Sequence, residues 1–211
     1  MKKLFSAILF LLVICSGVSG QDKAEKRILF FGDSITAGLG VSADQAFPAL
    51  IEDKIDSLGW NFEVVNGGLS GETSAGGLRR IDWVMRREID LFVLELGGND
   101  GLRGIDLKST RENLKKIIEK VRGKYPDARI FLAGIRVPPN LGPDYTEQFR
   151  TMYPEIAEEM DVRLIPLLLE GVGGNPEMMQ GDGIHPNAKG HRKAAEKVWR
   201  YMRPVLEEMR Q

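Results

Sequence analysis

Short apolar segments alternate with amphipathic segments along most of this 211-residue chain. Five segments have the length of a strand and are nearly continuously apolar: residues 27–31, 62–65, 89–94, 129–135 and 162–167. Continuous apolar runs of this length are typical of parallel strands that are covered on both faces. The pattern therefore predicts an α/β fold with a central parallel sheet.

Between the apolar segments, hydrophobic residues recur at helical spacing. Four such stripes consist of Phe47, Leu50, Ile51, Ile55 and Leu58; Leu114, Ile117, Ile118 and Val121; Phe149, Met152, Tyr153, Ile156, Ala157 and Met160; and Ala194, Ala195, Val198, Trp199 and Met202. Pro154 interrupts the third stripe and predicts a kink or a new start of that helix. The stripes are expected to pack on the sheet, and the alternation predicts a doubly wound arrangement.

The first 20 residues predict a secretory signal peptide. A short basic start precedes an uncharged, mostly apolar run that ends at Cys15, and Val18 and Gly20 are small enough for cleavage after Gly20. The run is shorter than the roughly 20 apolar residues of a transmembrane helix, so no stable membrane span is expected. Lipidation of Cys15 is the alternative, but Ile14 is bulky where a small residue is needed. We expect export across the inner membrane to the periplasm.

Residues 21–211 are expected to form a single domain, because they contain no repeat, low-complexity tract or clear linker. Without its signal the chain has no cysteine, which excludes a disulfide, a thiolate metal site and a cysteine nucleophile. The net charge is −1 for the whole chain, and charges of both signs are interspersed. No basic excess favours nucleic acid as a partner. The pattern does not predict an oligomeric state.

Polar, glycine-rich segments follow the first four predicted strands, where a parallel sheet gathers its functional groups. Gly32-Asp33-Ser34 follows the first strand and offers a serine hydroxyl as a nucleophile. The same three residue types are also common in turns. Several such segments at one edge of the sheet predict a shared site.

His185 is the candidate general base. Asp182 precedes it by three residues on the same loop, a spacing that lets the carboxylate reach imidazole Nδ1 and leaves Nε2 for a serine proton. His191, the other histidine, falls in the last predicted helix and is expected to be a surface residue. An acyl-transfer site also needs oxyanion donors, and the candidates are the backbone N–H groups of Ser34 and Gly71 and the Asn99 amide.

These segments resemble, in order and rough spacing, the four sequence blocks of the SGNH (GDSL-like) hydrolase family. The blocks are Gly32-Asp33-Ser34, Gly71, Gly98-Asn99-Asp100 and Asp182-x-x-His185, and the resemblance extends from residue 27 to residue 204. It implies a three-layer α/β/α sandwich with a flavodoxin-like, five-stranded parallel sheet. It also implies a catalytic triad of Ser34, His185 and Asp182, with Ser34, Gly71 and Asn99 as oxyanion donors and no cofactor or metal.

Residues 94–104, with residues 66–74 and 179–187, are similar to a secreted subgroup of this family that hydrolyses small-molecule acyl esters and thioesters over a broad range. In that subgroup the corresponding segment binds substrate, which implies a substrate-binding role for Gly101, Leu102, Arg103 and Gly104. Arg103 and Arg136 are candidates to meet an anionic group of the substrate, although solvated arginines are commoner. Pro138 is expected to stiffen a loop that walls the substrate site.

Other functions remain as alternatives. A carbohydrate O-acetyl esterase would use the same machinery. A metal-dependent phosphohydrolase would use Asp33, Asp100 and Asp182, but the chain lacks a clustered ligand pattern, and Asp33 and Asp100 suit loop-forming roles. A non-catalytic lipid- or carbohydrate-binding module could share the fold but does not need a complete catalytic set. The absence of a Gly-x-Ser-x-Gly segment around Ser34 disfavours the α/β-hydrolase fold.

Overall fold

A computed structural model describes residues 25–137 and 141–211. Its five strands are β1 (Lys26–Gly32), β2 (Phe62–Asn66), β3 (Leu91–Glu95), β4 (Arg129–Ala133) and β5 (Arg163–Ile165). All neighbouring strands are parallel, in the order β2-β1-β3-β4-β5. The predicted five-stranded parallel sheet is therefore confirmed, with strand ends that differ from the predicted ranges by up to two residues.

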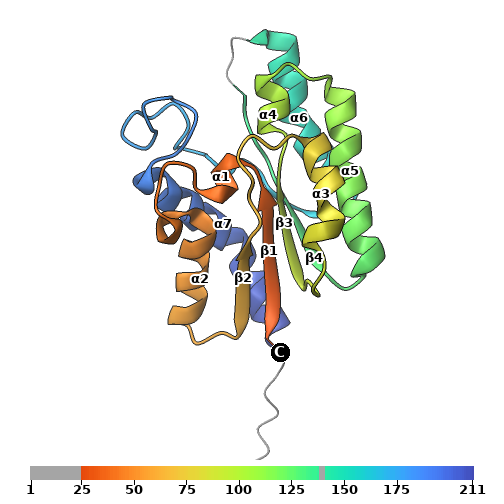
Figure 1. The fold of residues 1–211 in the computed structure, drawn as a ribbon, viewed down its shortest axis with the longest axis vertical. Helices are drawn as coiled ribbons and strands as arrows, with labels where there is room; N and C mark the ends of the chain where they lie inside the picture. The colour runs from red at the N-terminus through yellow and green to blue at the C-terminus, as the bar shows by residue number, and fades with distance from the viewer. Residues whose placement is uncertain (1–24, 138–140) are drawn as a thin grey trace, which may run out of the picture.

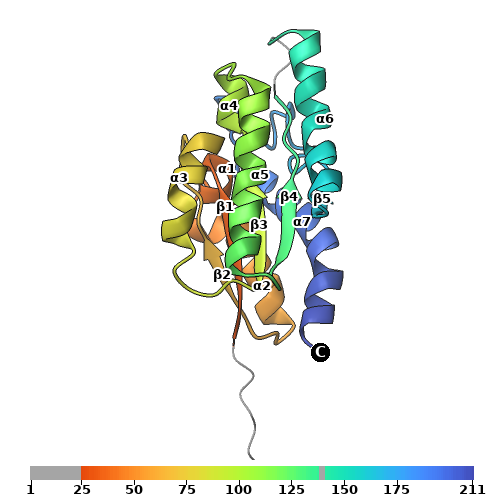
Figure 2. The ribbon, with the colours of Figure 1, turned by 90° about the vertical axis from the view of Figure 1, so that its right-hand side faces the viewer.

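Two layers of helices cover the sheet (Figures 1 and 2). Helices α2 (Phe47–Ser57) and α7 (Ala188–Met209) pack on one face, and α3 (Ser74–Val84), α5 (Leu107–Lys124) and α6 (Pro143–Glu159) pack on the other. Alternate residues of β1 divide between the two cores, since Ile28 and Phe30 face α2 and α7 while the residues between them face the opposite layer. The predicted α/β/α sandwich is confirmed, and α6 continues through Pro154.

Three short helical elements lie in the connections. They are α1 (Ser34–Ala37), the 3₁₀ turn η1 (Ala43–Gln45) and α4 (Gly98–Leu102). The glycine-rich segment after β3 consists of residue types that are common in turns, yet most of it forms α4. Gly97 allows this sharp entry into a helix, because its φ of +113° lies in the region that favours glycine.

The order of the strands indicates where a ligand site can form. Chain connections diverge between β1 and β3, and open parallel sheets bind ligands at the carboxyl ends of strands at such a point. In Figure 1, β1 runs upward and leads into α1, and α1, α4 and the blue loop before α7 all lie at this upper edge. The pairing of Gly32 with Glu95 brings the end of β1 beside the end of β3.

The N-terminal signal predicted for residues 1–20, Cys15 and Pro138 lie outside the described residues. Within residues 25–137 and 141–211, no helix is both long enough and apolar enough to span a bilayer. The C-terminus lies near the start of β1, where the Lys26 ammonium donates to the carbonyl oxygen of Met209.

Candidate active site

Ser34 stands at the exit of the interior strand β1, as the first residue of α1. Asp33 caps this helix, because its carboxylate accepts a hydrogen bond from the Ile35 N–H at 3.0 Å. A bond over two residues holds tightly the turn from which the Ser34 side chain projects. Ser34 is 8% exposed, so its hydroxyl is shielded on most sides.

The loop before α7 brings His185 and Asp182 to this serine. His185 Nε2 lies 2.9 Å from Ser34 Oγ, and His185 Nδ1 lies 2.6 Å from Asp182 Oδ2. The other carboxylate oxygen, Asp182 Oδ1, accepts from the N–H groups of Ile184 at 2.9 Å and His185 at 3.0 Å. One aspartate thus holds both the loop backbone and the imidazole.

Bonds at both ends of this loop keep it in place. The Gln180 N–H donates to the His185 carbonyl at 2.8 Å, and the Gln180 amide donates to the carbonyls of Leu39 and Pro186. Asn187 then caps α7, because its side chain accepts from the N–H groups of the first turn. The imidazole is therefore anchored to the segment after α1 as well as to α7.

Asp182 stays ionised over the whole physiological range. The hydrogen bond from the His185 ring, followed by the two backbone N–H bonds, lowers the pKa of Asp182 to about 2. A carboxylate that accepts from Nδ1–H fixes the tautomer in which Nε2 is free to take a proton. The Asp182–His185–Ser34 row can therefore draw the proton from the serine hydroxyl.

The Asn99 side chain lies next to this row, at the start of α4. Its amide nitrogen is 3.1 Å from Asp33 Oδ2 and 3.1 Å from the Glu72 carbonyl oxygen. Both neighbours only accept, so the amide group must direct its nitrogen toward them. In this arrangement Asn99 uses both of its N–H bonds within the protein.

Gly71 lies on the loop after β2 with a φ of +78°, a conformation that favours glycine. Arg103 donates to the Gly71 carbonyl at 3.0 Å, which links this loop to the end of α4. The buried carboxylate of Glu72 pairs with Arg80, whose guanidinium also donates to the Gly67 carbonyl at 2.9 Å. Arginines thus hold the Gly71 carbonyl and the side chain of the next residue, Glu72.

The residues expected to bind substrate differ in exposure. Gly101 is buried, and a Cβ there would lie 2.2 Å from Val137 Cγ1, so a side chain at this position would clash. Leu102, Arg103 and Gly104 lie on the surface at the end of α4, and Arg136 is exposed beyond β4.

Asp33 and Asp100, which were expected to form loops, are both buried and hydrogen-bonded. Asp100 accepts from the Ser74 N–H at 2.8 Å and from the Ser74 and Thr110 hydroxyls, so it ties α4 to α3 and α5. Across the described part of the chain, no group of three His, Cys, Asp or Glu side chains is placed to hold a metal ion.

His191 is not the surface residue that its sequence position suggested, because it is fully buried. Its Nδ1 accepts from the Phe47 N–H at 3.3 Å, so the ring proton resides on Nε2. Ala46, the residue before α2, has no side chain that can cap the helix. His191 of α7 instead accepts the hydrogen bond from the first N–H group of α2. The long-range packing of α7 on α2 buries a residue that local sequence could not place.

A pH-dependent loss of stability is expected from His191. Burial, and then the charge of His185, lower the pKa of His191 from 6.5 to about 4. Between pH 6.5 and pH 4, His191 is therefore protonated in the unfolded chain but neutral in the folded chain. The free energy of unfolding should therefore fall by on the order of 2–3 kcal/mol as the pH drops from 6.5 to 4. Urea unfolding at pH 7 and pH 4.5 should show a smaller loss in His191→Gln, and equal losses would contradict this assignment.

Glu95 is a buried carboxyl group near Ser34 that was not among the predicted site residues. It ends β3, and its Oε2 accepts from the Thr36 hydroxyl at 2.7 Å and from the Asp33 N–H at 3.3 Å. The sequence does contain a signal for this residue, because a single glutamate stands between apolar residues in Leu94-Glu95-Leu96. A charged residue in such a run is rarely buried unless it has a partner.

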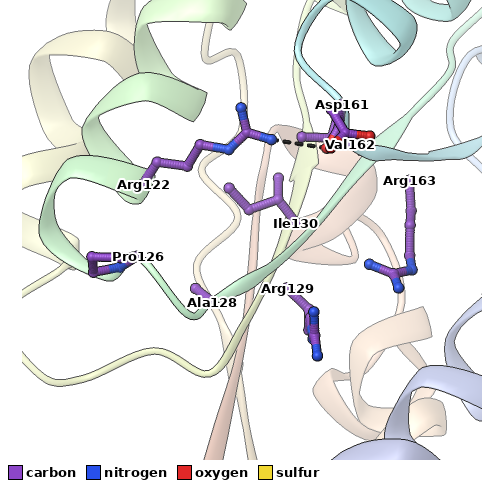
Figure 3. A pocket seen from close by; sticks show the side chains of 8 residues that line it. All are labelled: Arg122, Pro126, Ala128, Arg129, Ile130, Asp161, Val162 and Arg163. Atoms are coloured by element: carbon purple, nitrogen blue, oxygen red, sulfur yellow. Dashed lines mark hydrogen bonds between the residues drawn. The ribbon is translucent and has the colours of Figure 1, made fainter.

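A hollow of about 620 Å³ lies away from these groups (Figure 3). It opens where β4 and β5 begin, at the opposite edge of the sheet from Ser34. Arg122 donates to the Asp161 carbonyl at 2.8 Å on one side of it, and Arg129 and Arg163 line it from the starts of the two strands. This hollow plays no part in the arrangement around Ser34.

An α/β/α sandwich that carries a hydrogen-bonded Ser–His–Asp row at the carboxyl edge of its sheet defines a serine hydrolase. Comparison with known proteins agrees with this class. The model of the GDSL-like Lipase/Acylhydrolase family matches residues 30–193. The chain belongs to this family.

Two similar proteins and one solved structure support the assignment. Over 187 residues the chain is 42% identical to esterase TesA of Pseudomonas aeruginosa, covering 88% of this chain and 92% of that protein. Over 199 residues it is 39% identical to thioesterase 1/protease 1/lysophospholipase L1 of Escherichia coli K12, covering 94% of this chain and 91% of that protein. A crystal structure of TesA matches with a TM-score of 0.81 and 41% identity, covering 85% of this chain and 99% of that one.

Proposed function

We propose that this enzyme hydrolyses acyl esters and thioesters, with Ser34 as nucleophile, His185 as general base and Asp182 as the group that orients His185. The observation that carries this proposal is the continuous row from Asp182 Oδ2 through His185 to Ser34 Oγ, with contacts of 2.6 Å and 2.9 Å. His185 Nε2 takes the Ser34 proton while Oγ bonds to the substrate carbonyl carbon. The same proton then goes to the leaving alcohol or thiol, and water releases the acyl group from Ser34 by the reverse sequence.

The charge that develops on the carbonyl oxygen needs donors that are already in place. We assign these to the N–H groups of Ser34 and Gly71 and to the Asn99 amide. Since Asn99 donates to Asp33 and Glu72 at rest, the bond to the Glu72 carbonyl is the one that substrate must displace. The bond to Asp33 then keeps the amide nitrogen in position.

Asn99→Ala is expected to lower kcat by about 10²- to 10³-fold, because the lost donor acts mainly on the transition state. KM for a p-nitrophenyl ester should change little. Asn175→Ala is a matched control, because this asparagine caps a surface turn and donates nothing to the site. A variant whose loss appeared entirely in KM would argue against an oxyanion role for Asn99.

The substrate is proposed to carry an apolar acyl chain. Four large apolar side chains, each on a segment that carries a site residue, are 42–49% exposed: Leu39, Leu69, Leu102 and Ile184. Together they offer apolar surface for a chain leaving the Ser34 carbonyl site. The similar proteins are named as an esterase and as a thioesterase and lysophospholipase, which favours the same substrates here.

A substrate panel on the purified enzyme tests this function. We expect kcat/KM to rise with acyl length across p-nitrophenyl esters and to be measurable for acyl thioesters, and EDTA should have no effect. Preference for acetylated sugars would instead support the carbohydrate O-acetyl esterase. Loss of activity on chelation, restored by a divalent metal, would support the phosphohydrolase.

We further propose that the enzyme is exported, that residues 1–20 are removed, and that residues 21–211 form the mature domain. The basic start and apolar run support this proposal. The mass of the protein recovered from the periplasm of an expressing bacterium tests it, and an intact Met1 would contradict cleavage.

A further inference from the structure

Two buried carboxyl groups, Glu95 and Asp33, meet beneath Ser34. Glu95 is 1% exposed and Asp33 is 2% exposed. Gly32 leaves room for this approach, because a Cβ there would lie 2.5 Å from Glu95 Oε2 and 2.1 Å from Thr36 Oγ1. The Asp33 backbone N–H donates to Glu95 Oε2 at 3.3 Å, which brings the two acidic residues together. A hydrogen bond between their carboxyl groups needs a proton on one of them.

The surrounding donors show which carboxyl group holds that proton. Both Asp33 oxygens accept a donor, Oδ1 from the Ile35 N–H and Oδ2 from the Asn99 amide. Glu95 Oε2 accepts from Thr36 and Asp33, but among the described residues Glu95 Oε1 has no donor. An ionised Glu95 would leave a buried charge half satisfied, whereas a protonated Glu95 can donate to Asp33.

We propose that Glu95 is a positioning residue of the oxyanion site, which in its protonated form donates to Asp33 and so fixes the carboxylate that aims the Asn99 amide. This inference rests on the proposed function for its catalytic consequence, but the proton on Glu95 can be observed independently. It gives Asp33 a role beyond capping α1. It also limits the negative charge next to the developing oxyanion to that of one carboxylate, since two would oppose it more strongly.

The ionisation behaviour of the pair agrees with this assignment. Burial, and then the charge of Asp33, raise the pKa of Glu95 well above its usual value. Burial raises the pKa of Asp33 to about 6, while bonds from Ile35 and Asn99 and the charge of His185 oppose this rise. Besides His185, Tyr153 of α6 is an ionisable group close to the pair, and its hydroxyl donates to the Leu96 carbonyl at 3.0 Å. Two interacting carboxyls titrate as a unit, with the first proton lost from the pair leaving Asp33 ionised.

Infrared spectroscopy of the intact enzyme tests the protonation state directly. At pH 7 the wild-type enzyme should show the carbonyl stretch of a buried, protonated carboxylic acid. Glu95→Gln should lose that band, and Asp82→Asn, which changes an exposed carboxylate on α3, should keep it. Absence of the band in the wild-type enzyme, or its survival in Glu95→Gln, would overturn the proposal whatever reaction the enzyme catalyses.

Kinetics test the positioning role. Glu95→Leu removes the donor to Asp33 and is expected to lower kcat by about 10- to 100-fold, with KM changed by less than about threefold, since small displacements of catalytic groups are costly. Glu95→Gln should recover most of this loss, because an amide can donate to Asp33 and accept from Thr36. If Glu95→Gln lost as much kcat as Glu95→Leu, or if Glu95→Leu kept the wild-type kcat, the positioning role would be wrong. If Glu95→Leu does not fold, the proposal is still tested by the kcat of Glu95→Gln, compared with that of the wild type, and by the infrared band.

Discussion

Replacing Ser34 with alanine is expected to lower kcat for p-nitrophenyl ester hydrolysis by at least about 10⁴-fold. The hydroxyl is the atom that attacks the substrate, and its bond to His185 Nε2 at 2.9 Å is the contact through which it is activated. Without Oγ no acyl-enzyme forms, and the remaining rate comes from the oxyanion donors acting on water. Steady-state kinetics on the purified variant measure this loss.

The same substitution should leave the fold intact. Ser34 is capped through the Asp33 carboxylate rather than through its own hydroxyl, so removing Oγ keeps the Ile35 bond that starts α1. Thermal unfolding by circular dichroism should show a melting temperature close to that of the wild type. Ser57→Ala is the matched control, because the Ser57 hydroxyl bonds to the Lys54 carbonyl on the surface of α2. A folded Ser34→Ala enzyme with wild-type turnover would refute the mechanism.

Asp182→Asn is expected to lower kcat by about 10³- to 10⁴-fold at pH 7. The asparagine amide can donate to His185 Nδ1, which would move the ring proton to Nε2 and leave no base for the Ser34 hydroxyl. The variant also loses the negative charge that stabilises the imidazolium. Steady-state kinetics with a p-nitrophenyl ester measure the effect, which should appear in kcat rather than in KM.

This substitution separates the chemistry of Asp182 from its structural role. Asparagine keeps the side-chain oxygen that accepts from the Ile184 and His185 N–H groups, so the loop should retain its shape. Asp161→Asn is the control, because this aspartate is exposed at the opposite edge of the sheet. A kcat within about tenfold of the wild-type value would contradict the proposed role of Asp182.

Strand positions could be predicted closely because the sheet is parallel and covered on both faces. The apolar run at 27–31 lies inside β1 (Lys26–Gly32), and the run at 129–135 starts with β4 (Arg129–Ala133). Strand ends were less predictable, since they depend on which partner residues complete the hydrogen bonds. The run at 162–167 reaches beyond β5 (Arg163–Ile165) on both sides, because the edge strand pairs with β4 over only three residues.

The helical turn α4 and the burial of His191 could not be predicted from the local sequence. Gly98–Leu102 reads as a loop because glycine and asparagine disfavour helices, yet it forms α4. Asp100 makes the difference, because it bonds to Ser74 and Thr110 on two other helices. The same kind of long-range contact buries His191 against α2. Tertiary packing overrides local propensity in both places.

The order of strands and helices, the polar segments at the carboxyl ends and the identity of Ser34, Asp182 and His185 as candidates all follow from the sequence. These features are local, since periodicity and short motifs depend on neighbouring residues. Only the tertiary structure decided that Ser34 and His185, which are 151 positions apart, lie 2.9 Å from each other. It also decided that Glu95 meets Asp33 beneath them, because that contact depends on the pairing of β1 with β3 and on burial that no local pattern encodes.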